Sequence, residues 1–136
     1  MTAGQIDQSI YEQAIQAGYN NEPAKFIVAQ ARLESADYTS DIFKLNNNMF
    51  GMKYAKQPLA VKGSPAPKSE GDFYAKYKQP TDSAKDVINR LYNIKMRGVT
   101  PEQLKTTTTP EQFADLLKKR GYFGVTACLL YTSDAA

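Results

Sequence analysis

Apolar residues near the start of the chain recur at the spacing of an amphipathic helix. Polar residues separate them between positions 5 and 17, so one side of the predicted helix is apolar. That side is made of Ile6, Ile10, Ala14 and Ala17. Gly18 follows and is expected to end the helix, because glycine adopts left-handed backbone at a helix end without strain.

A second helix is predicted to begin at Asn20 or Asn21, either of which can cap it. Glu22 and Pro23 fall in its first turn, where both residue types are favourable. Its apolar residues are Phe26, Ile27, Ala29, Ala31 and Leu33. A helix that is apolar over most of its circumference is typical of the centre of a domain.

The pattern changes after this helix. Thr39 and Ser40 can cap a short third helix, whose expected inward residues are Ile42, Phe43 and Leu45. Gly63, Pro65, Pro67 and Gly71 exclude a long helix between residues 52 and 77, whereas the runs LAVK and FYAKY are typical of short strands. We therefore predict a small β-hairpin with a long, flexible tip.

Helical periodicity returns at Thr81, a predicted N-cap. The inner side of that helix would carry Ala84, Val87, Ile88, Leu91 and Tyr92. Two later helices begin with the same four residues, TPEQ, at 100–103 and 109–112, which place Thr at the N-cap, Pro at N1 and Gln at N3 of a capping box. The last helix would turn Phe113, Leu116 and Leu117 inward and end at Gly121. The pattern predicts a mainly helical α+β domain.

Composition narrows the chemistry that such a domain can perform. The 136 residues suffice for one domain and include no His and a single Cys, Cys128. Without His there is no Ser-His-Asp or Cys-His nucleophile system, and His-containing zinc sites cannot be built. We expect carboxylate chemistry, with no metal and no cofactor.

The net charge and the hydropathy of the chain indicate which kinds of partner it can bind. The net charge of +3 suits an anionic polymer, but the lysines are spread along the chain, so we expect no nucleic-acid binding. No apolar run approaches the ~20 residues of a membrane span. The N-terminus lacks the basic and apolar regions of a signal peptide. We expect a monomer.

Two motifs carry a resemblance to a known family. AQARLES at 29–35 and NNMFGMK at 47–53 resemble the glucosaminidase domain of bacterial and phage cell-wall hydrolases. Ala36, Asp37 and Tyr38 depart from that pattern, because the family usually has Gly-Trp-Gly there. The resemblance covers roughly residues 5 to 127 and implies a lysozyme-like helical fold with a small β-hairpin lobe.

Glu34 is the general acid that this resemblance implies. Such an acid must keep its proton at neutral pH, whereas a solvated Glu has a pKa of about 4.3 and burial raises that value. Glu34 lies on the mostly buried second helix, in a stripe with Ile27, Gln30 and Ala31. The alternative is a helix-end Glu that forms a salt bridge.

A second acid is harder to assign. Family members often carry one on the β-hairpin, and Glu70 in PKSEGDFY is the first candidate, with Asp72 the second. Both lie in a Gly-rich, Lys-flanked segment, where a solvated loop charge is the commoner explanation. Many such enzymes are thought to use the substrate's acetamido group instead, which would make Glu70 dispensable.

The remaining candidates would contact the sugar. Tyr122 matches the Gly-Tyr pair that in this family points a phenol into the groove, and core packing is its alternative. Asn47, Asn48 and Phe50 either line the groove or form a tight turn that seats Phe50 in the core, and the structural role is favoured. Tyr38 is a further candidate, since the chain has no Trp to stack on a sugar ring.

The C-terminal run CLLYTSDAA, residues 128–136, resembles the translation of a sequencing adapter. We therefore interpret 1–127 as a C-terminally truncated catalytic domain and 128–136 as a non-native tail. A short C-terminal strand is the alternative interpretation.

The leading functional hypothesis is an endo-β-N-acetylglucosaminidase that cleaves β-1,4 bonds of peptidoglycan glycan strands. The alternatives are a lytic transglycosylase or muramidase on the same fold, and a catalytically silent wall-binding or phage structural module. We expect action at the bacterial cell wall, as a phage endolysin, a virion-associated protein or part of a larger exported protein.

Overall fold

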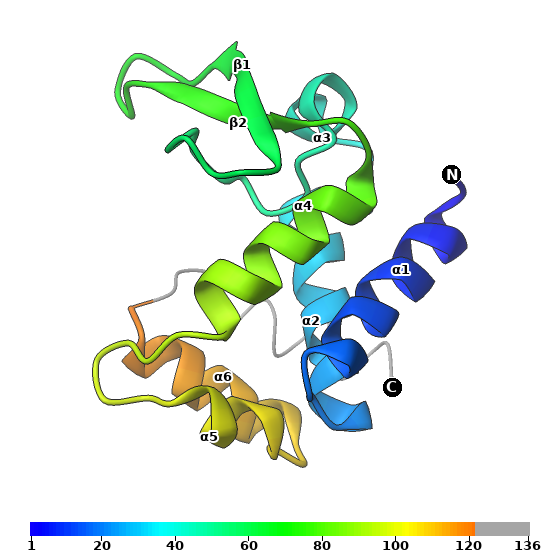
Figure 1. Cartoon of the computed structure of the whole chain (residues 1–136), viewed down its shortest axis with the longest axis vertical. Coiled ribbons are helices and arrows are strands. Elements are labelled where there is room, and N and C mark those ends of the chain that lie inside the picture. The colour runs from blue at the N-terminus through cyan, green and yellow to red at the C-terminus, as the bar shows by residue number, and fades with distance from the viewer. Residues whose placement is uncertain (122–136) are drawn as a thin grey trace.

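The computed structural model describes residues 1–121, and their fold is mainly helical with one small antiparallel sheet, as the sequence predicts (Figure 1). The helices are α1 (Ala3–Gln16), α2 (Asn21–Glu34), α3 (Asp41–Asn46), α4 (Pro80–Val87), the π-helix η1 (Ile88–Tyr92), α5 (Pro101–Lys105) and α6 (Pro110–Lys119). The strands are β1 (Ala60–Pro65) and β2 (Phe73–Tyr77). Figure 1 shows the hairpin and α3 at one end, α5 and α6 at the other, and α1, α2 and α4 between them.

The first two helices begin and end close to the predicted positions. Thr2 caps α1 in a full capping box, because its hydroxyl accepts from the Gln5 N–H while the Gln5 side chain accepts from the Thr2 N–H, at 3.1 and 2.8 Å. Gly18 follows the helix at φ 96°, in the left-handed region that glycine tolerates. Asn20 is the N-cap residue of α2, although its side chain makes no capping hydrogen bond.

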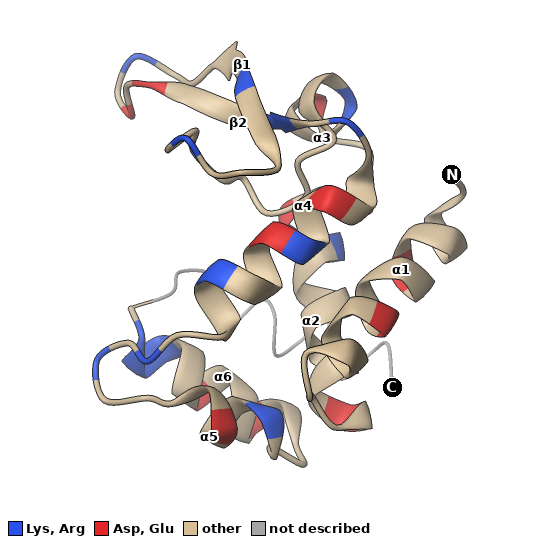
Figure 2. Ribbon diagram, in the orientation of Figure 1, with Lys and Arg blue, Asp and Glu red and all other residues tan. Residues whose placement is uncertain are grey.

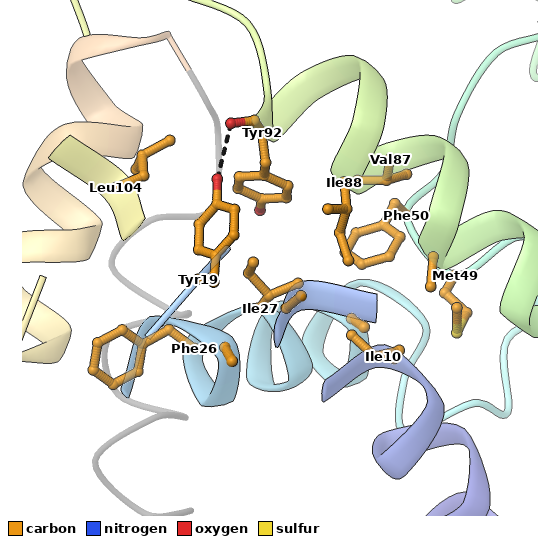
Figure 3. Close-up of a cluster of buried hydrophobic side chains, with 14 of the residues drawn as sticks. Ile10, Tyr19, Phe26, Ile27, Met49, Phe50, Val87, Ile88, Tyr92 and Leu104 are labelled. Carbon is orange, nitrogen blue, oxygen red and sulfur yellow. Dashed lines mark hydrogen bonds between the residues drawn. The ribbon is translucent and has the colours of Figure 1, made fainter. Parts of the chain in front are cut away.

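α2 forms the centre of the core (Figure 3). Seven of its residues are buried, and α1 packs along it. Across the core the Tyr19 hydroxyl donates to the backbone carbonyl of Tyr92 at 2.8 Å. Burial raises the pKa of Tyr19 well above its ordinary value, so this phenol stays a neutral donor.

The hairpin forms where the strand pattern predicts it. Ala60 lies opposite Tyr77, and the pairing is irregular between Lys62 and Pro65. Residues 66–72 form the tip, in which the Glu70 and Gly71 N–H groups both donate to the Pro67 carbonyl. Ala60, Ala75 and Tyr77 form a small apolar cluster on the sheet, and Met52 and Tyr54 pack against it.

Two sequence expectations are wrong in detail. The N-cap of α4 is Gln79 instead of Thr81, because Pro80 occupies the first helical position, where its fixed φ is favourable. The Thr81 hydroxyl instead accepts from Ser9 of α1 at 2.8 Å. In α3, Leu45 is 60% exposed, and the buried residue is Asn46.

The two TPEQ segments start α5 and α6 as predicted, with Thr100 and Thr109 as N-caps. The capping box is complete only at Thr100, because the Gln112 side chain accepts from the N–H of Thr108 instead of Thr109. No helix within residues 1–121 has the length and apolar character needed to cross a membrane.

Candidate active site

Glu34 is the last residue of α2 and is exposed. The residues that precede it on the same face, Ile27 and Ala31, are fully buried. The expectation that Glu34 shares their burial is therefore wrong: its side chain is exposed at the last position of the helix, although Ser35 directly after it is buried. α2 thus presents a carboxylate at the surface on a rigidly packed support.

A left-handed turn follows Glu34 directly. Ala36, Asp37 and Tyr38 have φ of 52°, 55° and 65°, a conformation that costs non-glycine residues roughly 1–2 kcal/mol each. The Gly-Trp-Gly pattern usual in the family has glycine at the first and third of these positions, and this chain lacks it. Glycine adopts positive φ without strain, which gives a physical reason for that pattern. Ser35, which is buried, holds the turn: its hydroxyl donates to the Ala31 carbonyl at 2.7 Å and accepts from the Tyr38 N–H at 2.9 Å.

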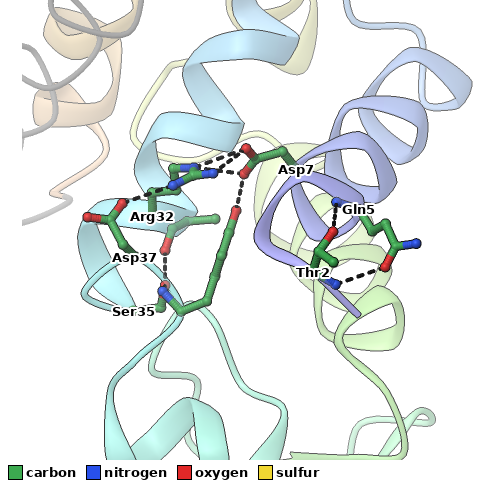
Figure 4. Close-up of polar contacts among 8 residues, drawn as sticks. Thr2, Gln5, Asp7, Arg32, Ser35 and Asp37 are labelled. Atoms are coloured by element: carbon green, nitrogen blue, oxygen red, sulfur yellow. Dashed lines mark hydrogen bonds and ion pairs between the residues drawn. The ribbon is translucent and has the colours of Figure 1, made fainter.

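The side chains beside this turn converge on Asp7 of α1 (Figure 4). The Arg32 guanidinium donates to both Asp7 carboxylate oxygens at 2.6–3.0 Å, and the Tyr38 hydroxyl donates to the same carboxylate at 2.6 Å. Arg32 also pairs with Asp37 at 3.2 Å and lies over the Tyr38 ring. We call Asp7, Arg32, Asp37 and Tyr38 the Asp7 clamp.

Asp7 is one of the polar residues between the apolar positions of the first helix, and the sequence gives it no role. Its partners are 25 and 31 residues away, and only the packing of α1 on α2 brings them together. Tyr38 is itself 7% exposed, with its ring against Phe43 at 5.7 Å between centroids. Sugar binding by Tyr38 stays a prediction, and this burial does not favour it.

The asparagine run joins α3 to the hairpin. The Asn46 side chain donates to Ser64 and accepts from the Ser64 N–H, the Asn47 amide donates to the Tyr77 carbonyl, and the Asn48 amide donates to the Met52 and Ala75 carbonyls. These bonds are 2.8–3.0 Å long. The structural role that the sequence favours therefore accounts for all three side chains, while sugar contact by Asn47 and Asn48 stays a prediction.

Two neighbours of this run show how closely it is packed. Phe50 is 6% exposed within the main core, so its sugar-binding role also stays a prediction. Gly63 of β1 lies where an added Cβ would be 2.3 Å from the Asn46 Oδ1 and 2.7 Å from the Tyr74 carbonyl. Only glycine fits this approach of the hairpin to α3.

Glu70 lies on the hairpin tip, half exposed, and pairs with Lys53 at 3.3 Å. The next two residues, Gly71 and Asp72, both have positive φ and are exposed. Glu70 is therefore a solvated charge on a turn. Its ion pair with Lys53 lies at the surface, and such a pair contributes little to stability. Tyr122 and the run 128–136 lie outside the described residues.

Gln30 is buried, as its place in the stripe with Ile27 and Ala31 predicts. It lies one turn before Glu34, and neither polar atom of its amide has a hydrogen-bond partner among the described residues. An unpaired buried amide costs about 1–3 kcal/mol.

The β-lobe is tied to α4 by a buried pair. The Tyr77 hydroxyl donates to the Asp86 carboxylate at 2.6 Å, and burial, with that hydrogen bond, raises the pKa of Tyr77 above its ordinary range. Within residues 1–121 no group of three or more His, Cys, Asp or Glu side chains could hold a metal ion.

Comparison with known proteins identifies the family. The glucosaminidase family, described as mannosyl-glycoprotein endo-beta-N-acetylglucosaminidase, matches residues 10–135. The chain belongs to the glucosaminidase family. This membership supports glycoside hydrolysis, and peptidoglycan hydrolysis in general, as the activity of the domain.

Two solved structures share the fold of this glucosaminidase domain. One is a type VI secretion system effector–immunity complex from Pseudomonas protegens, with TM-score 0.66 and 19% identity over 97% of this chain and 89% of that chain. The other is the catalytic domain of the autolysin Auto from Listeria monocytogenes, with TM-score 0.63 and 21% identity over 98% and 81% of the two chains. The expected lysozyme-like fold is confirmed. No curated protein sequence gives a significant match.

Proposed function

We propose that this glucosaminidase domain is an endo-β-N-acetylglucosaminidase that hydrolyses the β-1,4 bond after N-acetylglucosamine in peptidoglycan glycan strands. The observation that carries the proposal is the position of Glu34: it is exposed at the end of the buried central helix, within the AQARLES motif of a chain that matches the family over residues 10–135. A substrate can reach this carboxyl, while the backbone that carries it is fixed by the core.

In this proposal Glu34 is the general acid. It donates its proton to the glycosidic oxygen as the bond from that oxygen to the sugar C1 breaks, and the bonding electrons leave with the oxygen. Water then adds to C1 and gives a reducing N-acetylglucosamine end, and the proton that the water loses restores Glu34. The C-terminal end of a helix carries partial negative charge, which disfavours an ionised carboxylate there. Exclusion of water by a bound glycan would also disfavour the ionised form of this carboxylate.

Two groups are candidates for the second catalytic group: the carboxylate of Glu70 and the acetamido oxygen of the substrate. The half-exposed ion pair of Glu70 with Lys53 on a turn gives that carboxylate no rigid support. We therefore assign the stabilisation of the cationic C1 to the acetamido group, and treat the hairpin as a lobe that shapes the binding surface.

Mass spectrometry of purified peptidoglycan after digestion tests the assignment. Reducing N-acetylglucosamine ends are expected, whereas reducing or anhydro N-acetylmuramic acid ends would identify a muramidase or a lytic transglycosylase. Absence of cleavage would identify a silent wall-binding or structural module.

Replacement of Glu34 by Gln is the matched test of its role. The amide keeps the shape of the side chain but cannot donate a proton to the leaving oxygen, so we expect at least about a 10²-fold loss of kcat. Circular dichroism should show an unchanged fold. Turnover close to that of the unchanged protein would refute the assignment of Glu34.

A further inference from the structure

We propose that Asp7 is a positioning residue for Glu34: through the Asp7 clamp, α1 fixes the direction in which the end of α2 presents its carboxylate. This inference rests on the proposed function of Glu34. Asp7 does not touch the reacting atoms and is not itself a catalytic residue.

The clamp holds the chain on both sides of Glu34. Arg32 lies two residues before it and Tyr38 four residues after it, and both donate to the one Asp7 carboxylate (Figure 4). The Arg32 pair is bidentate and charge-assisted, a geometry that constrains direction as well as distance. Its two side chains are only 25% and 28% exposed, so water screens the pair less than at an open surface.

The left-handed turn explains why an external anchor is needed. Three consecutive non-glycine residues, Ala36 to Tyr38, hold positive φ, and their conformation is unfavourable without tertiary support. The clamp supplies this support at two of the three: Asp37 pairs with Arg32, and Tyr38 bonds to Asp7. Glycines at this position would form the turn without strain, so the anchor compensates for the departure from Gly-Trp-Gly.

Catalysis depends strongly on this kind of constraint, because misplacement of a reacting group by about 1 Å can cost about 10²-fold in rate. If the clamp positions Glu34, weakening it lowers kcat while the affinity for the glycan changes little. If the clamp only stabilises the fold, weakening it lowers the melting temperature and leaves kcat per folded molecule unchanged.

The experiment uses the full chain with Tyr38→Phe and Asp7→Asn, assayed on soluble glycan strands well below the melting temperature of each variant. Tyr38→Phe removes one hydroxyl and keeps the ring, and we expect kcat to fall about three- to tenfold with KM within about twofold. Asp7→Asn also removes the charge, so we expect a loss of about tenfold or more with a similarly unchanged KM.

Tyr11→Phe is the matched control. Tyr11 is on α1 like Asp7, and its hydroxyl donates to Asn21 at the opposite end of α2, at 2.9 Å. The control loses the same chemical group, a hydroxyl that bonds α1 to the other end of α2, and its kcat should not change. An equal loss in Tyr11→Phe and Tyr38→Phe would overturn the proposal, because a general loosening of the helix pair would then explain both.

Glu34→Gln separates the failure of this inference from that of the proposed function. If Glu34→Gln is inactive and Tyr38→Phe keeps full kcat, the clamp proposal is overturned and the function stands. If the unchanged protein does not cleave, or if Glu34→Gln remains active, both are overturned. Should Asp7→Asn fail to fold, the kcat of Tyr38→Phe still decides.

Discussion

At the residue scale, the backbone after Glu34 is strained. Ala36 has φ 52°, and unlike Asp37 its side chain can form no local hydrogen bond to offset this conformation. The segment that follows the proposed catalytic acid therefore stores strain, which core contacts and the Asp7 clamp offset. Backbone strain of this kind clusters at functional sites.

Ala36→Gly should therefore stabilise the domain. Glycine adopts positive φ without steric cost, although it also gains entropy in the unfolded chain, and we expect a net gain of about 0.5–1 kcal/mol. Thermal unfolding should show a rise of roughly 2–4 °C. Ala55→Gly is the control, since Ala55 is exposed outside helices and strands and does not have positive φ. A lower melting temperature for Ala36→Gly would contradict the account of strain.

At the element scale, the hairpin is attached firmly at its base and loosely at its tip. Side chains of Asn46, Asn47 and Asn48 bind its strands, and Tyr77 binds Asp86. The tip, by contrast, is a turn of exposed residues with one surface ion pair, Lys53 with Glu70. A catalytic group needs held geometry, which the base of the hairpin provides and the tip does not.

Glu70→Gln should accordingly lower kcat by less than about tenfold, far below the 10²-fold loss expected at Glu34. Asp72→Asn is the comparison, because Asp72 is the other acid of the same exposed tip, and its effect should be equally small. The measurement is the kcat of both variants on the glycan strands used for Glu34→Gln. A loss at Glu70 as large as at Glu34, with binding intact, would make Glu70 the catalytic base or nucleophile.

At the scale of the whole molecule, charge is distributed unevenly (Figure 2). Residues 51–79, which include the hairpin, contain six lysines and two acids, a net charge of +4. Residues 1–121 together also carry +4, from 17 basic and 13 acidic side chains, so the helical remainder is neutral. Within that remainder, residues 1–50 carry −3 and residues 80–121 carry +3. The β-lobe therefore has the highest positive charge of the three parts, and it would attract an anionic wall polymer.

The double variant Lys62→Gln and Lys76→Gln should weaken binding to anionic cell walls, by about two- to fivefold at low salt and less at high salt, because salt screens exposed charges. Both lysines are exposed on the hairpin strands. The matched control is Lys118→Gln with Lys119→Gln on α6, which removes the same charge from the other end of the molecule. Cosedimentation with walls measures both, and equal weakening by the two pairs would show that only net charge matters.

The sequence by itself determined what depends on neighbours along the chain. The ends of helices at Thr100, Thr109 and Gly18, the alternation of the strands and the AQARLES and NNMFGMK motifs are local features, and they sufficed for the fold class and the family. Local chemistry also misled at Thr81, where Pro80 made Gln79 the cap.

Only the tertiary structure decided what surrounds the proposed acid. Glu34 is exposed, although Ile27, Gln30 and Ala31 of the same helical stripe are buried. The hydrogen bonds of Asp7 to Arg32 and Tyr38, and those of the asparagine run to the hairpin strands, join groups 18 to 31 residues apart. No periodicity or cap encodes such pairs, because their distances are set by how whole helices and strands pack against one another.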